Sequence, residues 1–138
     1  VAIGTSFATA AKEQHAKIKE LDMQNAQRVE YPTIDWELGT ALTGGNEAMA
    51  KELFGMLLDN LPDHVAAMDA AYQATDLNEL YKATHKFHGA TCYCPTPDLK
   101  HALKELEISA KNRDLQKISA QMHSVTRAIA ELKEKAKN

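Results

Sequence analysis

Strand-forming sequence is largely missing from this chain. Aromatic residues make up only 6% of its 138 residues, and no run of β-branched residues is long enough to form a strand. Alanine, leucine, lysine, glutamate and methionine, which favour helices, are frequent instead. This composition excludes a sheet-based domain. It predicts an all-α fold that can close one hydrophobic core without disulfides or metals.

The chain also lacks long apolar runs and long blocks of one charge. No stretch approaches the roughly 20 apolar residues needed to cross a bilayer, and the N-terminus does not have the pattern of a signal peptide. The formal net charge is −3, without a basic block of the kind that binds nucleic acid. We therefore expect a cytoplasmic domain, monomeric in isolation, that contacts neither nucleic acid nor a membrane directly.

Cysteine is scarce, since the chain has only Cys92 and Cys94. On a helix these two side chains would point to different sides, and they are too close in sequence to bridge without strain. A disulfide scaffold is therefore not expected, in agreement with a reducing compartment.

The chain divides into two parts at Pro32. Residues 1–31 carry only widely spaced apolar residues, and Pro32 disfavours helical geometry in the residue before it. We expect residues 1–31 to form a linker or N-terminal arm, and residues 32–138 to form the domain.

Helical periodicity accounts for most of the second part. Apolar residues spaced three and four apart predict helices over 47–72, 77–91, 98–110 and 115–132, with a short helix beginning near 33–38. Pro62 either begins the second half of the first long helix or kinks it. Asn46, Asp76 and Asp114 are suitable N-caps. Short loops between long amphipathic helices predict an antiparallel four-helix bundle with a short additional N-terminal helix.

One of the six histidines, His85, has an unusual setting. If Thr84 is at the centre of the buried face of its helix, His85 lies about 100° away, just outside the apolar arc. Gly89 follows one turn later, although glycine inside a helix costs roughly 0.5–1 kcal/mol relative to alanine. Because helical side chains lean toward the N-terminus, a side chain at position 89 would cover the imidazole. Gly89 keeps His85 accessible, lets another helix approach, or is neutral.

An accessible imidazole suits phosphoryl transfer. Neutral histidine is available near pH 7 and can attack phosphorus through a ring nitrogen. Lys82, Lys86 and His88 are the nearby groups that could neutralise charge on the phosphoryl oxygens. No cluster of carboxylates stands beside His85 to hold Mg²⁺. These features predict a carrier that has no cofactor of its own and obtains Mg²⁺ from a partner, rather than a self-sufficient enzyme.

The stretch from His85 to Cys94, HKFHGATCYC, resembles the phosphorylation motif of histidine phosphotransfer (HPt) domains, as do Ile34-Asp35-Trp36 and the segment from Met56 to Pro62. The resemblance covers roughly residues 33–135 and is strongest to the C-terminal HPt domain of BarA-type hybrid sensor kinases. It implies a phosphorelay module within a sensor histidine kinase. His85 would accept a phosphoryl group from the aspartate of one receiver domain and pass it to that of a response regulator.

The resemblance also implies roles for the neighbours of His85. Gly89 would clear the ring, and a basic side chain at position 86 or 88 would contact the phosphoryl oxygens. The chain departs from the family pattern at His88, where Lys or Arg is usual, and at Pro95, where Gly is usual. Because of Pro95, the conformation of the loop after the helix that carries His85 remains open, and with it the docking of the partner.

A receiver should dock over the helix flank that surrounds His85. An imidazole must be inserted into a recessed phosphoaspartate site, so the surface around it becomes buried. The expected contacts are Lys82, Lys86 and Gly89, with apolar area from Met56 or Leu58.

Two other interpretations of the same residues remain open. A metal site could use His85, His88 and Cys92 with Cys94 and His101, although their spacing matches no established zinc pattern. Alternatively, the bundle could be an adaptor that binds a partner helix through Met56 and Leu58 and is never phosphorylated.

Overall fold

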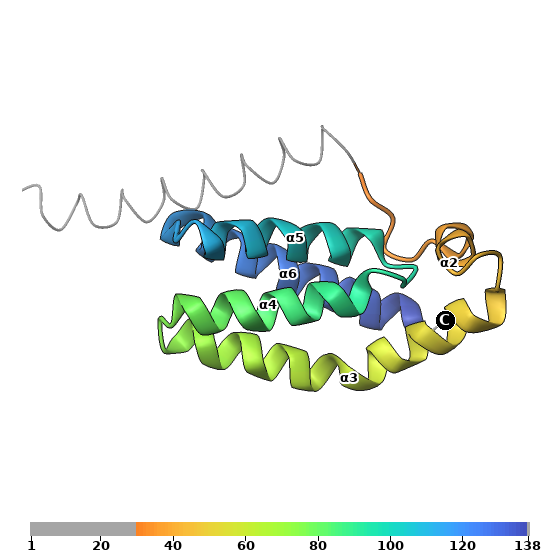
Figure 1. Ribbon diagram of the computed structural model, residues 1–138, viewed down its shortest axis with the longest axis horizontal. Helices are drawn as coiled ribbons and strands as arrows, with labels where there is room; N and C mark the ends of the chain where they lie inside the picture. The colour runs from red at the N-terminus through yellow and green to blue at the C-terminus, as the bar shows by residue number, and fades with distance from the viewer. Residues whose placement is uncertain (1–29, 138) are drawn as a thin grey trace, which may run out of the picture. The chain divides into compact units, whose positions relative to one another are not determined.

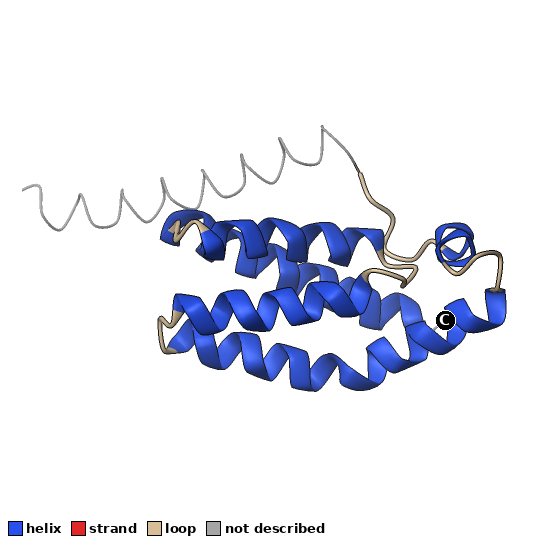
Figure 2. Ribbon diagram, in the orientation of Figure 1, coloured by secondary structure: helices blue, strands red, loops and turns tan. Residues whose placement is uncertain are grey.

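The computed structural model describes residues 30–137, and within them a compact unit begins at Tyr31. Within residues 30–137 the secondary structure is helical, with no strand (Figures 1 and 2). The helices are α2 (Trp36–Leu42), α3 (Glu47–Gln73), α4 (Leu77–Thr91), α5 (Pro97–Lys111) and α6 (Leu115–Ala136). The predicted all-α fold is confirmed, while the arm predicted for residues 1–31 lies almost entirely outside the described residues.

The four long helices run antiparallel to one another in chain order (Figure 1). Helix α4 lies between α3 and α5, and α5 packs in turn on α6. Across residues 30–137, no helix has the length and apolar character required to cross a membrane. The arrangement gives α4 two packed neighbours, one on each side, and leaves its outer surface open.

Side-chain caps fix where most of these helices begin. Asp35, Asn46, Asp76 and Asp114 each accept a hydrogen bond from the backbone N–H three residues later, at 3.0, 3.0, 3.1 and 3.2 Å. Each such cap typically contributes about 1 kcal/mol. Helix α5 begins differently, with Pro97 at its start and no side-chain cap from Thr96.

The buried core follows the predicted apolar faces. Phe87, Leu80, Leu103 and Leu106 are fully buried at its centre. Leu115 departs from the prediction, because it is 59% exposed. It is the first residue of α6, at the end of the bundle, where the apolar pattern continues but no neighbouring helix covers it.

Helix α3 continues unbroken through Pro62. Proline removes one intrahelical hydrogen bond and crowds the preceding turn, so helices bend at such positions. Figure 1 shows α3 curving along the bundle, with its N-terminal half leading toward α2. Of the two possibilities left open by the sequence, the structure therefore shows one continuous helix.

The loop after the site helix is held in place by α2. Pro95 is buried, and its carbonyl oxygen accepts a hydrogen bond of 2.9 Å from the N–H of Asp35. A Cβ added to Gly39 would lie 2.8 Å from the Cβ of Pro95, so this glycine permits the close approach of α2. The departure from the family pattern at position 95 thus supplies a packing contact to the short helix.

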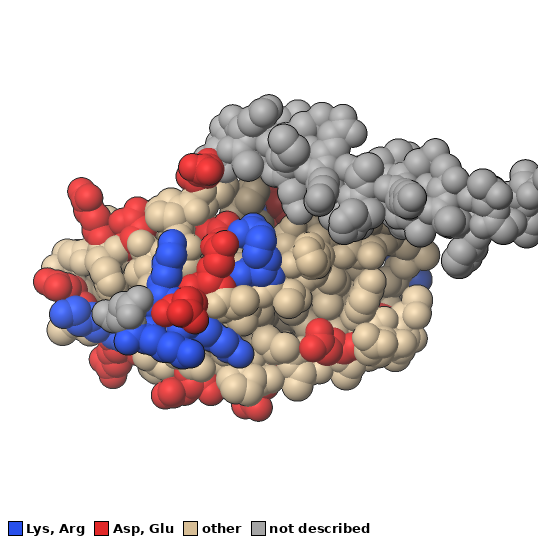
Figure 3. Space-filling view, turned by 180° about the vertical axis from the view of Figure 1, so that it is seen from behind, with Lys and Arg blue, Asp and Glu red and all other residues tan. Residues whose placement is uncertain are grey.

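Charged side chains of both signs mingle on the face opposite to that of Figure 1. Figure 3 shows Lys and Arg interspersed with Asp and Glu there, rather than a patch of one sign. Arg127 of α6 pairs with Glu131 at 3.4 Å and with Asp98 of α5 at 4.0 Å. The Arg127–Glu131 pair is largely exposed, and pairs of this kind contribute little to stability.

Candidate functional site

His85 projects from the outer surface of α4, and its side chain is 66% exposed. Its neighbours on either side along the chain behave as the helical periodicity predicts. Thr84 is fully buried, and Lys86 is exposed. The structure therefore places the imidazole where a second protein could reach it.

Glu107 of α5 joins His85 to His88, a contact that is absent from the predictions made from the sequence. One carboxylate oxygen contacts His85 Nδ1, and the other lies 3.1 Å from His88 Nδ1. The Glu107 side chain is only 15% exposed. A carboxylate this buried needs polar partners, and the two imidazoles of α4 provide them.

A signal for this contact exists in the sequence. Glu107 directly follows the buried Leu106 and lies one turn after the buried Leu103, at the border of the apolar face of α5. His88 lies in the same way at the border of the buried face of α4. Two polar residues at facing borders of consecutive antiparallel helices are candidates to meet.

His88 lies deeper than His85, with a side chain that is 19% exposed. Its Nε2 atom is buried and makes no hydrogen bond to another described residue. Burial lowers the pKa of His88. Glu107 opposes this shift, while Lys100, Lys104 and His85 reinforce it. A neutral imidazole is therefore favoured, which argues against the cationic phosphoryl contact implied for this position.

The lysines expected at the site lie on the outer and α3-facing parts of α4. Lys82 is exposed and donates to Glu79 at 3.5 Å. Lys86 is close enough to His64 of α3 to help burial lower the pKa of that imidazole, against the effect of Asp63. Positive charge is thus present on both sides of His85, because Lys100 and Lys104 of α5 face His88.

Gly89 is not required by internal packing. A Cβ added there would meet nothing within 4 Å, in contrast to Gly39. The possibility that Gly89 admits another helix of this bundle is therefore wrong. The space over Gly89 opens to the outside of the molecule, beside His85.

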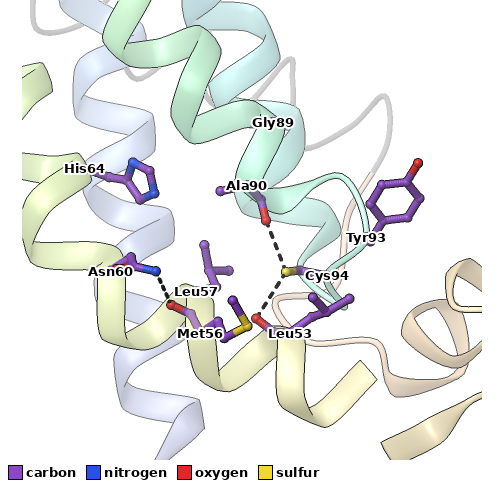
Figure 4. A pocket seen from close by; sticks show the side chains of 9 residues that line it. All are labelled: Leu53, Met56, Leu57, Asn60, His64, Gly89, Ala90, Tyr93 and Cys94. Atoms are coloured by element: carbon purple, nitrogen blue, oxygen red, sulfur yellow. Dashed lines mark hydrogen bonds between the residues drawn. The ribbon is translucent and has the colours of Figure 1, made fainter. Parts of the chain in front are cut away.

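An open pocket of about 280 Å³ lies between α3 and α4 (Figure 4). Its lining is mainly apolar and combines residues of α3 with the end of α4 and the turn that follows it, namely Leu53, Met56, Leu57, Asn60, His64, Gly89, Ala90, Tyr93 and Cys94. Met56 is 54% exposed at this pocket, whereas Leu58 packs against the core and is not part of the lining. Of the two apolar residues predicted for docking, the structure therefore places Met56 beside Gly89.

The contacts of Cys94 are those of a structural residue. Cys94 is buried, and its thiol donates to the carbonyl oxygens of Ala90 at 3.3 Å and Leu53 at 3.7 Å. Burial raises the pKa of Cys94 to about 11, with a smaller contribution from Cys92. Across residues 30–137, no group of three or more His, Cys, Asp or Glu side chains is arranged to hold a metal ion.

Comparison with known proteins adds independent findings. The family model described as "Hpt domain" matches residues 52–135, which include all of α4 and α5 and most of α3 and α6. A solved structure of the HPt domain of a sensor hybrid histidine kinase from Shewanella superposes with a TM-score of 0.61 at 27% identity. That match covers 74% of this chain and 92% of the other.

Two curated relatives are sensor kinases. The sensor histidine kinase GacS of Pseudomonas protegens is 32% identical over 111 residues, and the match covers 78% of this chain but only 12% of that protein. The signal transduction histidine-protein kinase BarA of Shigella flexneri is 27% identical over 88 residues, covering 61% of this chain and 10% of the relative. The chain thus corresponds to a small part of each.

Proposed function

The chain belongs to the Hpt domain family, whose members are phosphocarrier modules of two-component phosphorelays, and we propose that its phosphoacceptor is His85. His85 accepts a phosphoryl group from the aspartate of one receiver domain and passes it to the aspartate of a response regulator. By analogy with the kinases that it resembles, the domain acts as the cytoplasmic HPt part of a hybrid sensor kinase.

The setting of His85 is the observation that carries this proposal. Its imidazole is exposed on a rigid helix beside an open glycine position, and one ring nitrogen is held by a carboxylate from α5. A nucleophile that is both fixed in orientation and reachable by a macromolecule is what in-line phosphoryl transfer requires. None of the four other histidines within residues 30–137 combines these features.

The chemistry divides between the two proteins. The receiver supplies the acidic pocket and Mg²⁺, which neutralises charge on the phosphoryl oxygens, and this chain supplies the nucleophile. Lys82 and Lys86 attract the acidic receiver toward the outer surface of α4.

The pocket between α3 and α4 provides the apolar part of the docking surface. Its exposed residue Met56 lies on α3, across from Gly89, and Tyr93 adds a side chain that is 63% exposed. A receiver that inserts over His85 would cover this pocket. Transient complexes of this kind bury areas at the low end of the usual range.

Intact-protein mass spectrometry tests the acceptor. The 138-residue chain is incubated with a Mg²⁺-loaded receiver domain that has been charged with acetyl phosphate, and the sample is kept at neutral or alkaline pH. We expect the wild type to gain the mass of one phosphoryl group and His85→Gln to gain none. The variant should fold normally, because changes at exposed positions usually alter stability by no more than about 0.5 kcal/mol.

His101→Gln is the matched control for this experiment. His101 is another exposed histidine, on α5, and its ring stacks on that of Tyr31. The His101→Gln variant should accept a phosphoryl group as the wild type does. Full phosphorylation of His85→Gln would contradict the assignment of the acceptor.

A further inference from the structure

We infer that Asn60 and His64 are specificity-determining residues of the pocket between α3 and α4, and that they select a receiver whose docking surface presents an Asp or Glu carboxylate to them. The inference rests on the proposed function and goes further, because it states which kind of receiver the pocket accepts. It is carried by two polar side chains at one end of a pocket that is otherwise mainly apolar (Figure 4).

The two residues lie one helical turn apart on α3 and line the same space. Side chains at this spacing on a helix are neighbours, and Figure 4 shows Asn60 and His64 together at one end of the pocket, away from Leu53. Gly89, one turn after His85, lines the pocket from α4. A receiver that covers His85 therefore also covers these two polar side chains.

Both side chains have hydrogen-bonding groups that no described residue satisfies. Asn60 Nδ2 donates to the carbonyl oxygen of Met56 at 2.9 Å, which leaves the second amide hydrogen available (Figure 4). Among the described residues, no hydrogen bond involves the ring of His64, which is half-buried. Its neutral form can therefore carry the hydrogen on whichever nitrogen faces a partner. An apolar partner surface would take water away from these donors and offer nothing in return, which is costly.

Packing holds the imidazole of His64 in place before a partner docks. Its ring is nearly parallel to that of Phe87, with 4.6 Å between the centroids and 6° between the planes. Phe87 belongs to α4 and is fully buried, so the imidazole lies on a rigid base. A side chain that is already ordered loses little conformational entropy on binding, and its hydrogen bond can therefore contribute fully to the choice of partner.

The charges around this end of the pocket favour a carboxylate over a neutral acceptor. Burial lowers the pKa of His64, Lys86 of α4 lowers it further, and Asp63 raises it by less. The imidazole is therefore favoured as neutral, and at its position the positive potential of Lys86 outweighs the negative potential of Asp63. A carboxylate only accepts hydrogen bonds, so it can take one from each N–H. Bonds to an ionised group are also roughly twice as strong as neutral ones.

Phosphoryl transfer from a receiver tests the inference in the full 138-residue chain. Mg²⁺-loaded receiver domains are charged with acetyl phosphate, and the probe is the one that charges the wild type at the lowest concentration. We expect Asn60→Asp, which keeps the shape of the side chain but replaces the donor with a negative acceptor, to raise the half-saturating receiver concentration about ten- to a hundred-fold. The rate at saturation should remain that of the wild type, because only binding is altered.

Asn112→Asp is the matched control for this substitution. Asn112 is exposed at the C-cap of α5 and does not line the pocket, so the variant changes the charge equally and should dock as the wild type does. Tighter docking of Asn60→Asp would mean that the receiver presents a hydrogen-bond donor there, which contradicts the inference. So would an unchanged half-saturating concentration.

Two substitutions of His64 separate hydrogen bonding from packing. His64→Gln keeps a donor and should retain most of the affinity for the receiver. His64→Leu keeps an apolar contact with Phe87 but has no donor, and it should raise the half-saturating concentration about tenfold, as expected for one unpaired group. Equal half-saturating concentrations for the two variants would show that His64 acts through packing alone, and the inference would then be wrong for this residue.

Phosphorylation by potassium phosphoramidate distinguishes a failure of this inference from a failure of the proposed function. This reaction needs no docking partner, because the bond between a ring nitrogen of His85 and phosphorus forms as ammonia leaves. The variants at Asn60 and His64 should react at the wild-type rate, which also shows that they are folded. A slower reaction would mean that the substitutions act on His85 itself, and this would refute their role in docking. If the wild type becomes phosphorylated elsewhere than on His85, the proposed function fails. Normal phosphorylation of His85, with wild-type docking of the variants, would sink only the inference.

Discussion

The two flanks of α4 differ in what they present. The flank toward α5 is polar, with His85 and His88 sharing the carboxylate of Glu107. The flank toward α3 is an apolar pocket whose exposed edge includes Met56. Gly89 lies between the two, and its position is open to solvent. The residues proposed for the chemistry and those proposed for contact with the partner thus lie on opposite sides of α4, so that either set can be substituted without the other.

Both flanks depend on the same buried residue. Phe87 is fully buried beneath α4, and its ring stacks on that of His64 at 4.6 Å between centroids. We expect Phe87→Ala to lower the free energy of unfolding by about 3–5 kcal/mol and to impair both flanks together. Tyr93→Ala, at an exposed position, should cost far less. Denaturant unfolding followed by circular dichroism measures both, and similar losses for the two would contradict this placement of the core.

A substitution at Gly89 can block access of the receiver to both flanks of α4 without unfolding the helix. The position is empty, so Gly89→Ala should fold well and favour the helix by up to about 1 kcal/mol. Gly89→Gln should lower the rate of transfer from a receiver at least about tenfold, since the side chain would obstruct the docked partner, a loss of roughly 1.4 kcal/mol. The measurement is the initial rate of phosphoryl transfer from the charged receiver.

The matched control is Gly55→Gln on α3. Gly55 is another helical glycine where an added Cβ meets nothing within 4 Å, and it does not line the pocket. The control should transfer at the wild-type rate. An equal loss in both variants would mean that added bulk on these helices acts through the fold, so the steric role of Gly89 would be refuted.

The sequence predicted what local periodicity and capping determine. The long helices, the N-caps of α3, α4 and α6, and the exposure of His85 beside a buried Thr84 all follow from residues within one or two turns. The contact with Glu107 did not follow, because it depends on which face of α5 turns toward α4. The exposure of Leu115 also depends on where the bundle ends, which an amphipathic pattern does not record.

The choice between Met56 and Leu58 shows the same limit. Two residues apart on a helix, they point about 200° from each other, so only one can face a given neighbour. Both are candidates for docking on the sequence alone, because an amphipathic pattern does not give the packing order of the helices. The structure places Met56 in the pocket and Leu58 against the core.

Met56 therefore tests the apolar flank alone. We expect Met56→Ser to weaken receiver binding about three- to ten-fold, because roughly 1 kcal/mol of apolar contact is lost. The reaction of His85 with phosphoramidate should remain that of the wild type. Isothermal titration calorimetry with a Mg²⁺-loaded receiver measures the binding. A change in the phosphoramidate rate would show that the two flanks are coupled.

The smallest expected effect is on the pH dependence of the free energy of unfolding, to which one histidine on each flank of α4 contributes. Burial lowers the pKa of His64 on the α3 side and of His88 on the α5 side. Both are favoured as neutral in the folded protein, whereas in the unfolded chain they take up a proton near pH 6.5. Their contribution to stability is therefore full above this pH and is lost as the pH falls toward and below the folded-state pKa values. The free energy of unfolding changes by at most about 1.4 kcal/mol per pH unit for each proton.

We expect His64→Gln and His88→Gln each to flatten the decline in the free energy of unfolding between pH 7 and pH 5. His123→Gln, at an exposed position on α6, should leave it unchanged. Urea unfolding at a series of pH values measures these slopes. If only one of the two variants flattens the curve, then only that flank excludes water well enough to keep its imidazole neutral.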